Sequence, residues 1–225
     1  MSHKNIELVA ADGFGVDAYV AEPDGAPVAG LVVLQEIFGV NQHIREVTDR
    51  FARRGYLAIA PALFDRARKG VELGYDQAGM QQGMAARSQI ALEKTLLDMG
   101  AAIQWLRGQG MKRVGVVGYC WGGSLAWFAN TRLDVDASVS YYGGLIAAAA
   151  DEKNKAPAIF HFGELDKHIG PDEWATIRAA HPELPLYTYD ADHGFNCDHR
   201  SAYNAAAASL AEERTLEFFA AHLLT

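Results

Sequence analysis

Short apolar runs alternate along the chain with longer stretches in which apolar residues recur every three or four positions. Runs that are apolar throughout are typical of strands buried on both faces of a sheet, and the longer spacing indicates amphipathic helices. The pattern predicts strands at 16–20, 31–34, 56–60, 114–117, 137–141, 158–162 and 186–189. It predicts helices at 42–53, 90–106, about 121–130 and 205–223. Because strands and helices alternate, we expect an α/β fold with a mostly parallel central sheet and helices on both faces.

Residues 62–89 interrupt this alternation with a polar stretch that contains four glycines, at positions 70, 74, 79 and 83. We interpret the stretch as a loop that makes an excursion over the sheet edge, and loops of that length often carry function. No linker, repeat or low-complexity tract divides the chain beyond two short alanine runs. The prediction is therefore one domain over residues 1–225.

Composition narrows the classes of function. Half of the 225 residues are hydrophobic and 21% are charged, as in a soluble globular protein. The formal net charge of −8 disfavours nucleic acid and anionic membranes as partners. The N-terminus lacks the apolar core of a signal peptide, and no apolar run approaches the ~20 residues of a membrane span. Two cysteines are too few for a disulfide framework, so we expect a cytoplasmic protein with reduced thiols.

Cys120 lies in the sequence Gly118-x-Cys120-x-Gly122, between a predicted strand and a predicted helix. That context is what a nucleophile elbow requires, since the tight turn leaves no room for side chains at the two glycines. The helix that follows points its N-terminus at the thiol, which favours a thiolate and a developing oxyanion. A buried structural cysteine in a glycine-rich turn is the alternative. A dinucleotide-binding turn fits less well, because the glycine spacing does not match G-x-G-x-x-G.

Asp166 and His193 follow the cysteine in the chain order nucleophile, acid, histidine that α/β-hydrolases use. Each comes directly after a predicted strand, where ligand-facing loops lie. The imidazole can take up the thiol proton, and the carboxylate can fix its tautomer. Taken singly, either residue could belong to an ordinary turn. A metal site from His161, Asp166, His168, His193 and His199 is a weaker alternative without a recognised ligand spacing, so we expect neither a metal nor a cofactor.

Several motifs together resemble the dienelactone hydrolase (carboxymethylenebutenolidase) family of the α/β-hydrolase superfamily. The resemblance spans nearly the whole chain, and the sequences that carry it are Gln35-Glu36-Ile37-Phe38-Gly39, Gly118-Tyr119-Cys120-Trp121-Gly122-Gly123, Tyr141-Tyr142-Gly143, His161-Phe162-Gly163 with Asp166, His193-Gly194-Phe195 and Glu213-Arg214-Thr215-Leu216. It implies an α/β-hydrolase fold and a catalytic triad of Cys120, His193 and Asp166.

The resemblance also implies roles for the residues around the triad. Glu36 lies near the thiol in the resting enzymes of this family, and substrate binding displaces it so that the thiolate forms. On its sequence alone, Glu36 could equally be a solvated loop residue. The oxyanion hole would use the backbone N–H groups of Ile37 and Trp121. Side chains expected to line the pocket, with core packing as their alternative role, are Phe38, Tyr141 and Tyr142.

The chain departs from the resemblance where a substrate carboxylate would bind. The family carries an arginine four residues after the catalytic histidine, and Cys197 occupies that position here. Arg200 is the nearest arginine, and Arg87 is our candidate for a second one, with Arg66 and Arg68 as alternatives. A bidentate arginine–carboxylate contact is geometrically demanding, so the substrate can differ even where the chemistry is the same.

These observations predict a hydrolase for a small lactone or ester, such as a carboxylate-bearing dienelactone from the degradation of aromatic compounds. A non-catalytic thiol-sensing or binding protein on the same fold is one alternative, and acyl transfer or thioester cleavage by the same triad is another. We expect a monomer or a small homo-oligomer. The sequence specifies neither the natural substrate nor the metabolic pathway.

Overall fold

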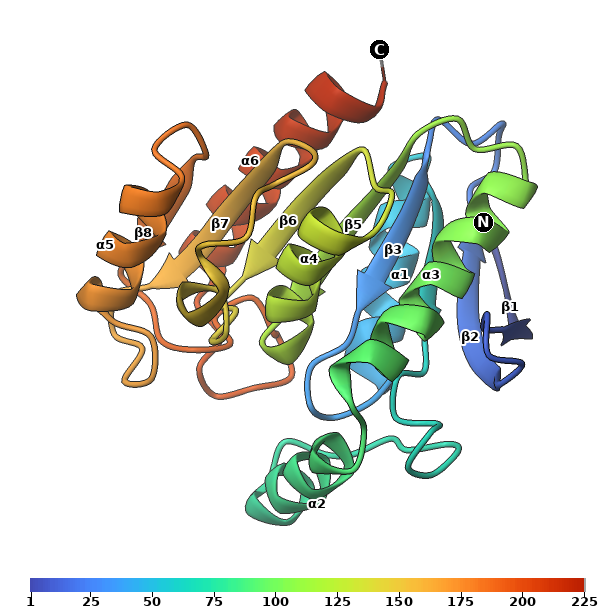
Figure 1. Ribbon diagram of the computed structural model, residues 1–225, viewed down its shortest axis with the longest axis horizontal. Coiled ribbons are helices and arrows are strands. Elements are labelled where there is room, and N and C mark those ends of the chain that lie inside the picture. Colours follow the sequence, from blue (N-terminus) through green and yellow to red (C-terminus); the bar gives the residue numbers. More distant parts are fainter. Residues whose placement is uncertain (225) are drawn as a thin grey trace.

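The centre of the molecule is an eight-stranded sheet, seen in the computed structural model, which describes residues 1–224 (Figure 1). Its strand order is β1-β2-β4-β3-β5-β6-β7-β8. The two pairings that involve β2 are antiparallel and all the others are parallel. The strands are β1 (Ser2–Val9), β2 (Gly15–Glu22), β3 (Gly30–Leu34), β4 (Leu57–Pro61), β5 (Val114–Tyr119), β6 (Ala137–Tyr141), β7 (Ala158–Gly163) and β8 (Leu186–Tyr189).

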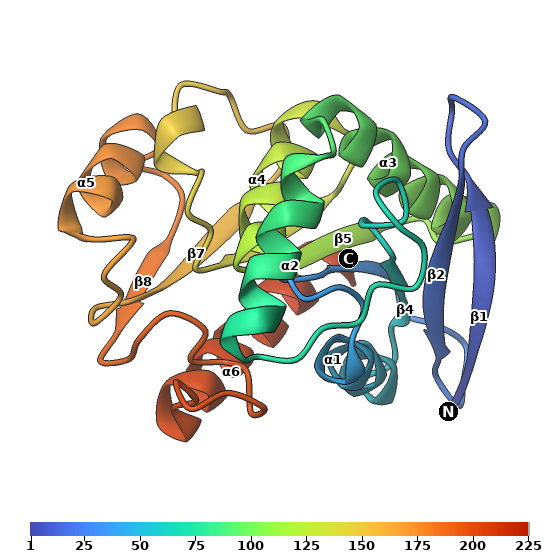
Figure 2. The same ribbon diagram turned by 90° about the horizontal axis from the view of Figure 1, so that it is seen from below.

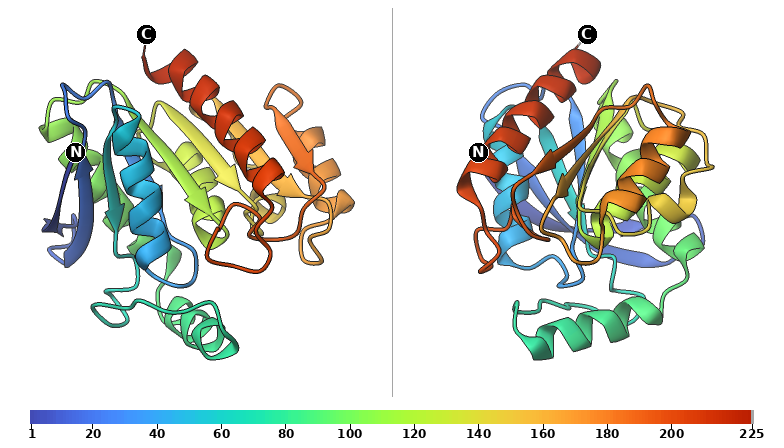
Figure 3. Two further views of the ribbon diagram at one scale, coloured as in Figure 1. Left: turned by 180° about the vertical axis from the view of Figure 1, so that it is seen from behind. Right: turned by 90° about the vertical axis from the view of Figure 1, so that its left-hand side faces the viewer.

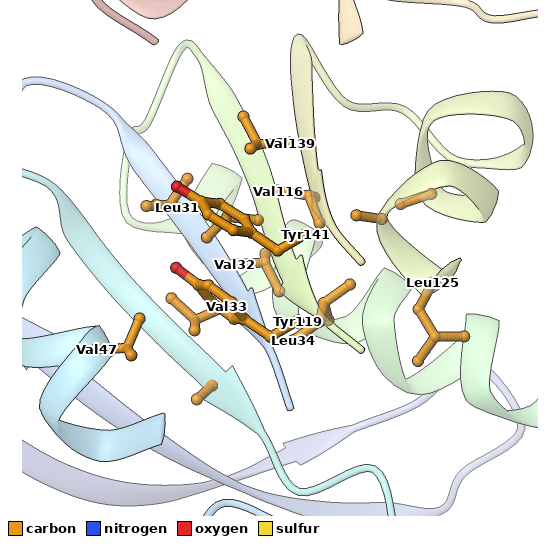
Figure 4. Packing of buried hydrophobic residues seen from close by; sticks show 14 of the residues in the cluster. Leu31, Val32, Val33, Leu34, Val47, Val116, Tyr119, Leu125, Val139 and Tyr141 are labelled. Carbon is orange, nitrogen blue, oxygen red and sulfur yellow. The ribbon is translucent and has the colours of Figure 1, made fainter. Parts of the chain in front are cut away.

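Helices cover both faces of this sheet, as the alternating pattern predicts. On one face, α1 (Gln42–Arg53) and α6 (Ala205–Leu223) run side by side (Figure 3). The other face carries α3 (Leu92–Gly108) and α4 (Trp121–Arg132), while α5 (Pro171–Ala180) packs on the short 3-10 helix η1 (Ala147–Ala149). Every residue of the central strands β3, β5 and β6 is buried, which explains their unbroken apolar runs. Figure 4 shows their side chains packed together, with the rings of Tyr119 and Tyr141 adjacent.

The parallel α/β architecture and its seven predicted strands are confirmed, but three elements besides the short helix η1 are absent from the predictions. The strand β1 is an edge strand in which Leu8 alone is buried and most other residues are exposed, so its sequence lacks an apolar alternation. The helix α5 buries only Trp174 and Ile177. The excursion at 62–89 contains a third element, α2 (Gln77–Ser88), whose buried residues are all small: Gly79, Gly83 and Ala86.

The helix α2 lies across the edge of the sheet at which the parallel strands end (Figure 2). The carboxyl ends of β3, β5, β7 and β8 lead into the loops that carry the predicted site residues, so this edge is where they come together. Among residues 1–224, no helix combines the length and the apolarity that crossing a bilayer requires.

Candidate active site

Cys120 occupies a strained backbone conformation between β5 and α4. Its φ of 55° and ψ of −115° lie where side chains are disfavoured, which costs of the order of 1–3 kcal/mol. The neighbouring glycines permit this turn. A Cβ at Gly118 would lie 1.8 Å from the carbonyl oxygen of Gly122, and a Cβ at Gly122 would lie 2.3 Å from that of Leu34. The turn leaves Cys120 partly exposed at the N-terminus of α4, where a thiolate is favoured.

Asp166 and His193 meet across two loops. The Nδ1 atom of His193 lies 2.6 Å from Oδ2 of Asp166, while the backbone N–H of His168 donates to Oδ1 at 2.8 Å. The Asp166 side chain is fully buried, and that of His193 is 20% exposed. Burial alone would raise the pKa of Asp166, but its hydrogen bonds from His193 and His168 lower it overall. The carboxylate therefore remains charged and holds the imidazole in one orientation.

The opposite nitrogen of His193 is left for the thiol. Burial works to lower the pKa of His193, but hydrogen bonding to Asp166 and to Cys120 outweighs it and raises that pKa to about 10. The imidazolium form is thus stabilised beside Cys120. A thiolate next to an imidazolium is the reactive form of a cysteine nucleophile, so this geometry can pass a proton from sulfur to nitrogen and back.

Two backbone N–H groups near the thiol have no protein acceptor in the described residues. Ile37 is the third residue after the end of β3, and its N–H donates to no described group. Trp121 is the first residue of α4, where an N–H has no intrahelical acceptor. The Trp121 ring is stacked on Phe64, with ring centroids 5.2 Å apart, which fixes the start of the helix. The resemblance implies that these two N–H groups bind an oxyanion, and that role stays a prediction.

Glu36 is fully buried, and its carboxylate is engaged on both oxygens. Arg200 Nη1 donates to Oε1 at 3.2 Å, and the Tyr75 hydroxyl donates to Oε2 at 3.1 Å. Arg200 also lies over the rings of Phe38 and Tyr75, 5.7 and 5.6 Å from their centroids. Burial acts to lower the pKa of Arg200, but the charge of Glu36 raises it overall, as Cys120 also does to a smaller extent. The contacts of Glu36 are therefore to Arg200 and Tyr75, and a contact with the resting thiol stays a prediction.

Two groups of side chains near Glu36 have the composition of metal ligands. One comprises Glu36, His43 and Cys197, whose ligand atoms lie within 4.8 Å of one another, and the other comprises His43, Asp198 and His199. His43 Nδ1 is 3.1 Å from Asp198 Oδ1, and its buried Nε2 has no partner among residues 1–224. Arg200, which forms an ion pair with Glu36, would repel a metal cation bound by the first group.

Of the histidines considered for a metal site in the sequence, His168 and His193 lie together beside Asp166, with ring centroids 6.4 Å apart, whereas His161 and His199 have other partners. His161 is buried between the Tyr189 hydroxyl and Thr215 Oγ1, at 2.8 and 3.2 Å, and burial lowers its pKa to about 3. His199 pairs with Glu46 at the surface. His161 thus serves a hydrogen-bond network between β7, β8 and α6.

The predicted pocket residues differ in how close they lie to the triad. The Tyr142 ring lies 5.0 Å from that of His193, centroid to centroid, and its φ of 40° turns it toward the catalytic edge. The ring of the preceding residue, Tyr141, lies 6.1 Å from that of Tyr142, centroid to centroid, and its hydroxyl is 2.7 Å from Thr215 Oγ1. Phe38 packs on the Tyr75 ring at a centroid distance of 4.6 Å. Of the three, Phe38 and Tyr142 lie next to the site, and Tyr141 supports it from the core.

The candidate arginines are also separated. Arg200 reaches Glu36 directly, whereas Arg87 is half-buried in a groove of about 400 Å³ between α2, α3 and α4 that Trp121 also lines. Arg66 is bound by Asp12 and by the buried Asp98, so its guanidinium is already occupied. Arg68 is exposed beside a different groove, formed with α2.

Sequence reasoning missed Tyr75, His43 and Asp198, which hold the Glu36 region together. Tyr75 lies in the excursion, where no hydrophobic period marks it, and its contact with Glu36 spans 39 positions. Asp198 joins His43 over 155 positions. Only the Asp-His-Arg sequence at 198–200 close after His193 could have pointed to this cluster.

The doubly covered parallel sheet, the strained cysteine at a strand-to-helix turn and the Asp–His pair define the α/β-hydrolase class. The model of the dienelactone hydrolase family matches residues 16–223. The carboxymethylenebutenolidase of Pseudomonas putida is 34% identical over 229 residues, which cover 98% of this chain and 97% of that protein. A Synechocystis protein provisionally named carboxymethylenebutenolidase is also 34% identical, with 92% of each chain covered.

A solved structure agrees with these sequence relatives. It is a Klebsiella pneumoniae protein provisionally described as a dienelactone hydrolase, with a TM-score of 0.84, 29% identity, and coverage of 98% of this chain and 99% of that one. This chain belongs to the dienelactone hydrolase family and is an ester hydrolase. Its substrate is a small molecule, an ester or a lactone.

Proposed function

We propose that this protein hydrolyses a small lactone or ester through an acyl-enzyme on Cys120. The Cys120 thiolate attacks the carbonyl carbon, and the N–H groups of Ile37 and Trp121 bind the oxyanion. The C–O bond then breaks, and His193 gives its proton to the leaving oxygen. For a lactone, that oxygen stays attached to the acyl group as a free hydroxyl.

Water completes the cycle. His193 takes a proton from a water molecule, which attacks the thioester and restores the thiol together with a carboxylic acid. Asp166 keeps the imidazole oriented through both steps. The observation that carries the proposal is the coupling of His193 to both Asp166 and Cys120, which raises its pKa to about 10. Such a perturbed histidine beside a partly exposed thiol is typical of a catalytic site.

The Glu36–Arg200 pair supports a carboxylate-bearing substrate. Arg200 is half-buried and has one described carboxylate partner, Glu36. A substrate carboxylate could compete for the same guanidinium, because arginine forms charge-assisted bonds to two carboxylates at once or to either alone. Release of Glu36 would then free its carboxylate to take the proton of the Cys120 thiol, which would couple substrate recognition to activation. The candidate for a second cation is Arg87, at the groove beside Trp121.

The test is to trap the acyl-enzyme on an activated aryl acetate and locate it by mass spectrometry. We expect a transient mass increase of one acetyl group on Cys120 and a burst of phenol equal to the enzyme concentration. Cys120→Ala should abolish both, and His193→Gln should lower the rate by about 10²- to 10⁴-fold. The matched control is Cys197→Ala, which removes the other thiol of the chain and should leave the burst intact. Full turnover by Cys120→Ala, or acetylation at Cys197, would refute the proposal.

A further inference from the structure

The loop that carries Ile37 is held in place by residues 71–88, which we name the strap. The backbone N–H of Leu73 donates to the Phe38 carbonyl at 2.9 Å, and Glu72 forms an isolated β-bridge with Gly39. The Asn41 side chain returns a hydrogen bond to the Leu73 carbonyl at 3.2 Å. The strap thus contacts the loop at several successive residues, and it ends in α2, which crosses the catalytic edge (Figures 1 and 2).

The helix α2 also approaches the loop closely, at the contact between Gly83 and Ile37. A Cβ placed on Gly83 would lie 1.9 Å from the Ile37 carbonyl oxygen, 3.0 Å from its carbonyl carbon and 3.4 Å from its Cβ. The bare Cα of Gly83 is therefore seated directly on the Ile37 backbone. Gly83 is buried in the middle of α2, where glycine is less favourable than alanine by about 1 kcal/mol, so helix stability does not account for it.

We infer that Gly83 is a positioning residue for the oxyanion hole: α2 sets the orientation of the Ile37 backbone through this contact. The inference rests on the proposed role of the Ile37 N–H. Real Cβ contacts shorter than 3.0 Å essentially never occur, so a side chain at 83 would force the two backbones apart by about 1.1 Å. A displacement of about 1 Å in a reacting geometry can lower a rate about 100-fold.

The experiment compares Gly83→Ala with two other Gly→Ala variants. Gly79→Ala is the matched control, because it lies in the same helix and its Cβ would also meet a carbonyl oxygen at 1.9 Å, but that oxygen belongs to Gly74 in the strap itself. Gly100→Ala in α3 has no atom within 4 Å of the new Cβ and reports the change in helix propensity alone. For each protein we would measure kcat and KM on an aryl ester and the rate of Cys120 alkylation by iodoacetamide.

Alkylation separates the oxyanion hole from the nucleophile, because displacement of iodide creates no oxyanion while ester hydrolysis does. We expect Gly83→Ala to lower kcat by about 10- to 100-fold, with KM and the alkylation rate changed by less than about threefold. Gly79→Ala and Gly100→Ala should keep kcat within about threefold of the wild type.

Two results would overturn the inference. One is a wild-type kcat in a folded Gly83→Ala variant, since α2 would then have moved without disturbing Ile37. The other is an equal loss of kcat in Gly79→Ala, since any disturbance of the strap would then be enough. An unalkylated Cys120 in the wild-type protein would instead refute the proposed nucleophile, so the two failures are distinguishable.

Discussion

The Asp166–His193 pair gives a direct test of how this site is charged. Asp166→Asn preserves the shape of the side chain and removes its negative charge, and an asparagine can hold the imidazole in the wrong tautomer. Burial lowers the pKa of His193, and the variant would lose the hydrogen bond to the Asp166 carboxylate that counteracts it most. Only the hydrogen bond to Cys120 would then still raise that pKa. We expect the pKa of His193 to fall and catalysis to decline with it.

The expected size of the pKa change in Asp166→Asn follows from the structure. The interval between the ordinary pKa of 6.5 and about 10 corresponds to about 5 kcal/mol between the two protonation states of His193. Asp166 and Cys120 share this effect, and an adjacent opposite charge usually moves a pKa by about 1 to 3. In Asp166→Asn the midpoint should therefore lie between about 7 and 9. The loss in kcat should be about 10²- to 10⁴-fold, because the imidazole would be poorly oriented.

The assay is an NMR titration of the His193 ring, run together with ester hydrolysis. The matched control is Asp192→Asn, because Asp192 is exposed and binds only the backbone N–H of His193, at 2.7 Å. The control should titrate as the wild type does. A midpoint that stays near 10 in Asp166→Asn, or that falls equally in Asp192→Asn, would refute this account of the charge on His193.

The same pair makes stability depend on pH. The folded-state pKa of His193 lies above its unfolded value, so its stabilisation is fully present below pH 6.5 and is lost as pH rises through about 10. The unfolding free energy of the wild type should therefore decrease across this range. In Asp166→Asn the decrease should be smaller and should be complete at a lower pH.

Two further predictions concern buried charges, and urea unfolding measures both. Arg66→Ala leaves the fully buried Asp98 carboxylate unpaired and should lower the unfolding free energy by about 3–5 kcal/mol. Lys94→Ala breaks only a half-exposed ion pair and should lower it by less than about 1 kcal/mol. Equal losses in the two variants would contradict this prediction. Arg200→Ala should likewise cost about 3–5 kcal/mol of unfolding free energy, because it leaves the buried Glu36 carboxylate without its cationic partner. Adding Glu36→Gln should restore much of that free energy. Additive losses in the double variant would show that the two side chains are not coupled.

Much of the fold could be predicted because its signals are local. The central strands are buried on both faces and therefore read as continuous apolar runs, and α1 has the bounds expected from its apolar spacing. The elbow could be predicted because a tight strand-to-helix turn requires glycine at positions 118 and 122, whatever surrounds it. Chain order then singled out Asp166 and His193, which lie 2.6 Å apart.

The surroundings of Glu36 could not be predicted, because they depend on contacts between distant segments. Arg200 reaches Glu36 across 164 positions, and Tyr75 reaches it from within the excursion. Neither contact produces a periodic pattern in the sequence. Likewise, Arg66 was an alternative to Arg87 for the second arginine, and its buried partner Asp98 shows that it is occupied.

The helix α2 shows why one kind of functional element escapes pattern reasoning. A periodic pattern of hydrophobic residues indicates a helix whose large side chains pack into a core. The helix α2 has no such pattern, because it buries only Gly79, Gly83 and Ala86. It packs through its backbone, and that is possible only where side chains are missing. The absence of large residues that hides α2 from the sequence pattern is therefore the same property that lets Gly83 rest on Ile37. A polar, glycine-rich excursion near a catalytic motif should accordingly be examined for backbone contacts as well as for catalytic side chains.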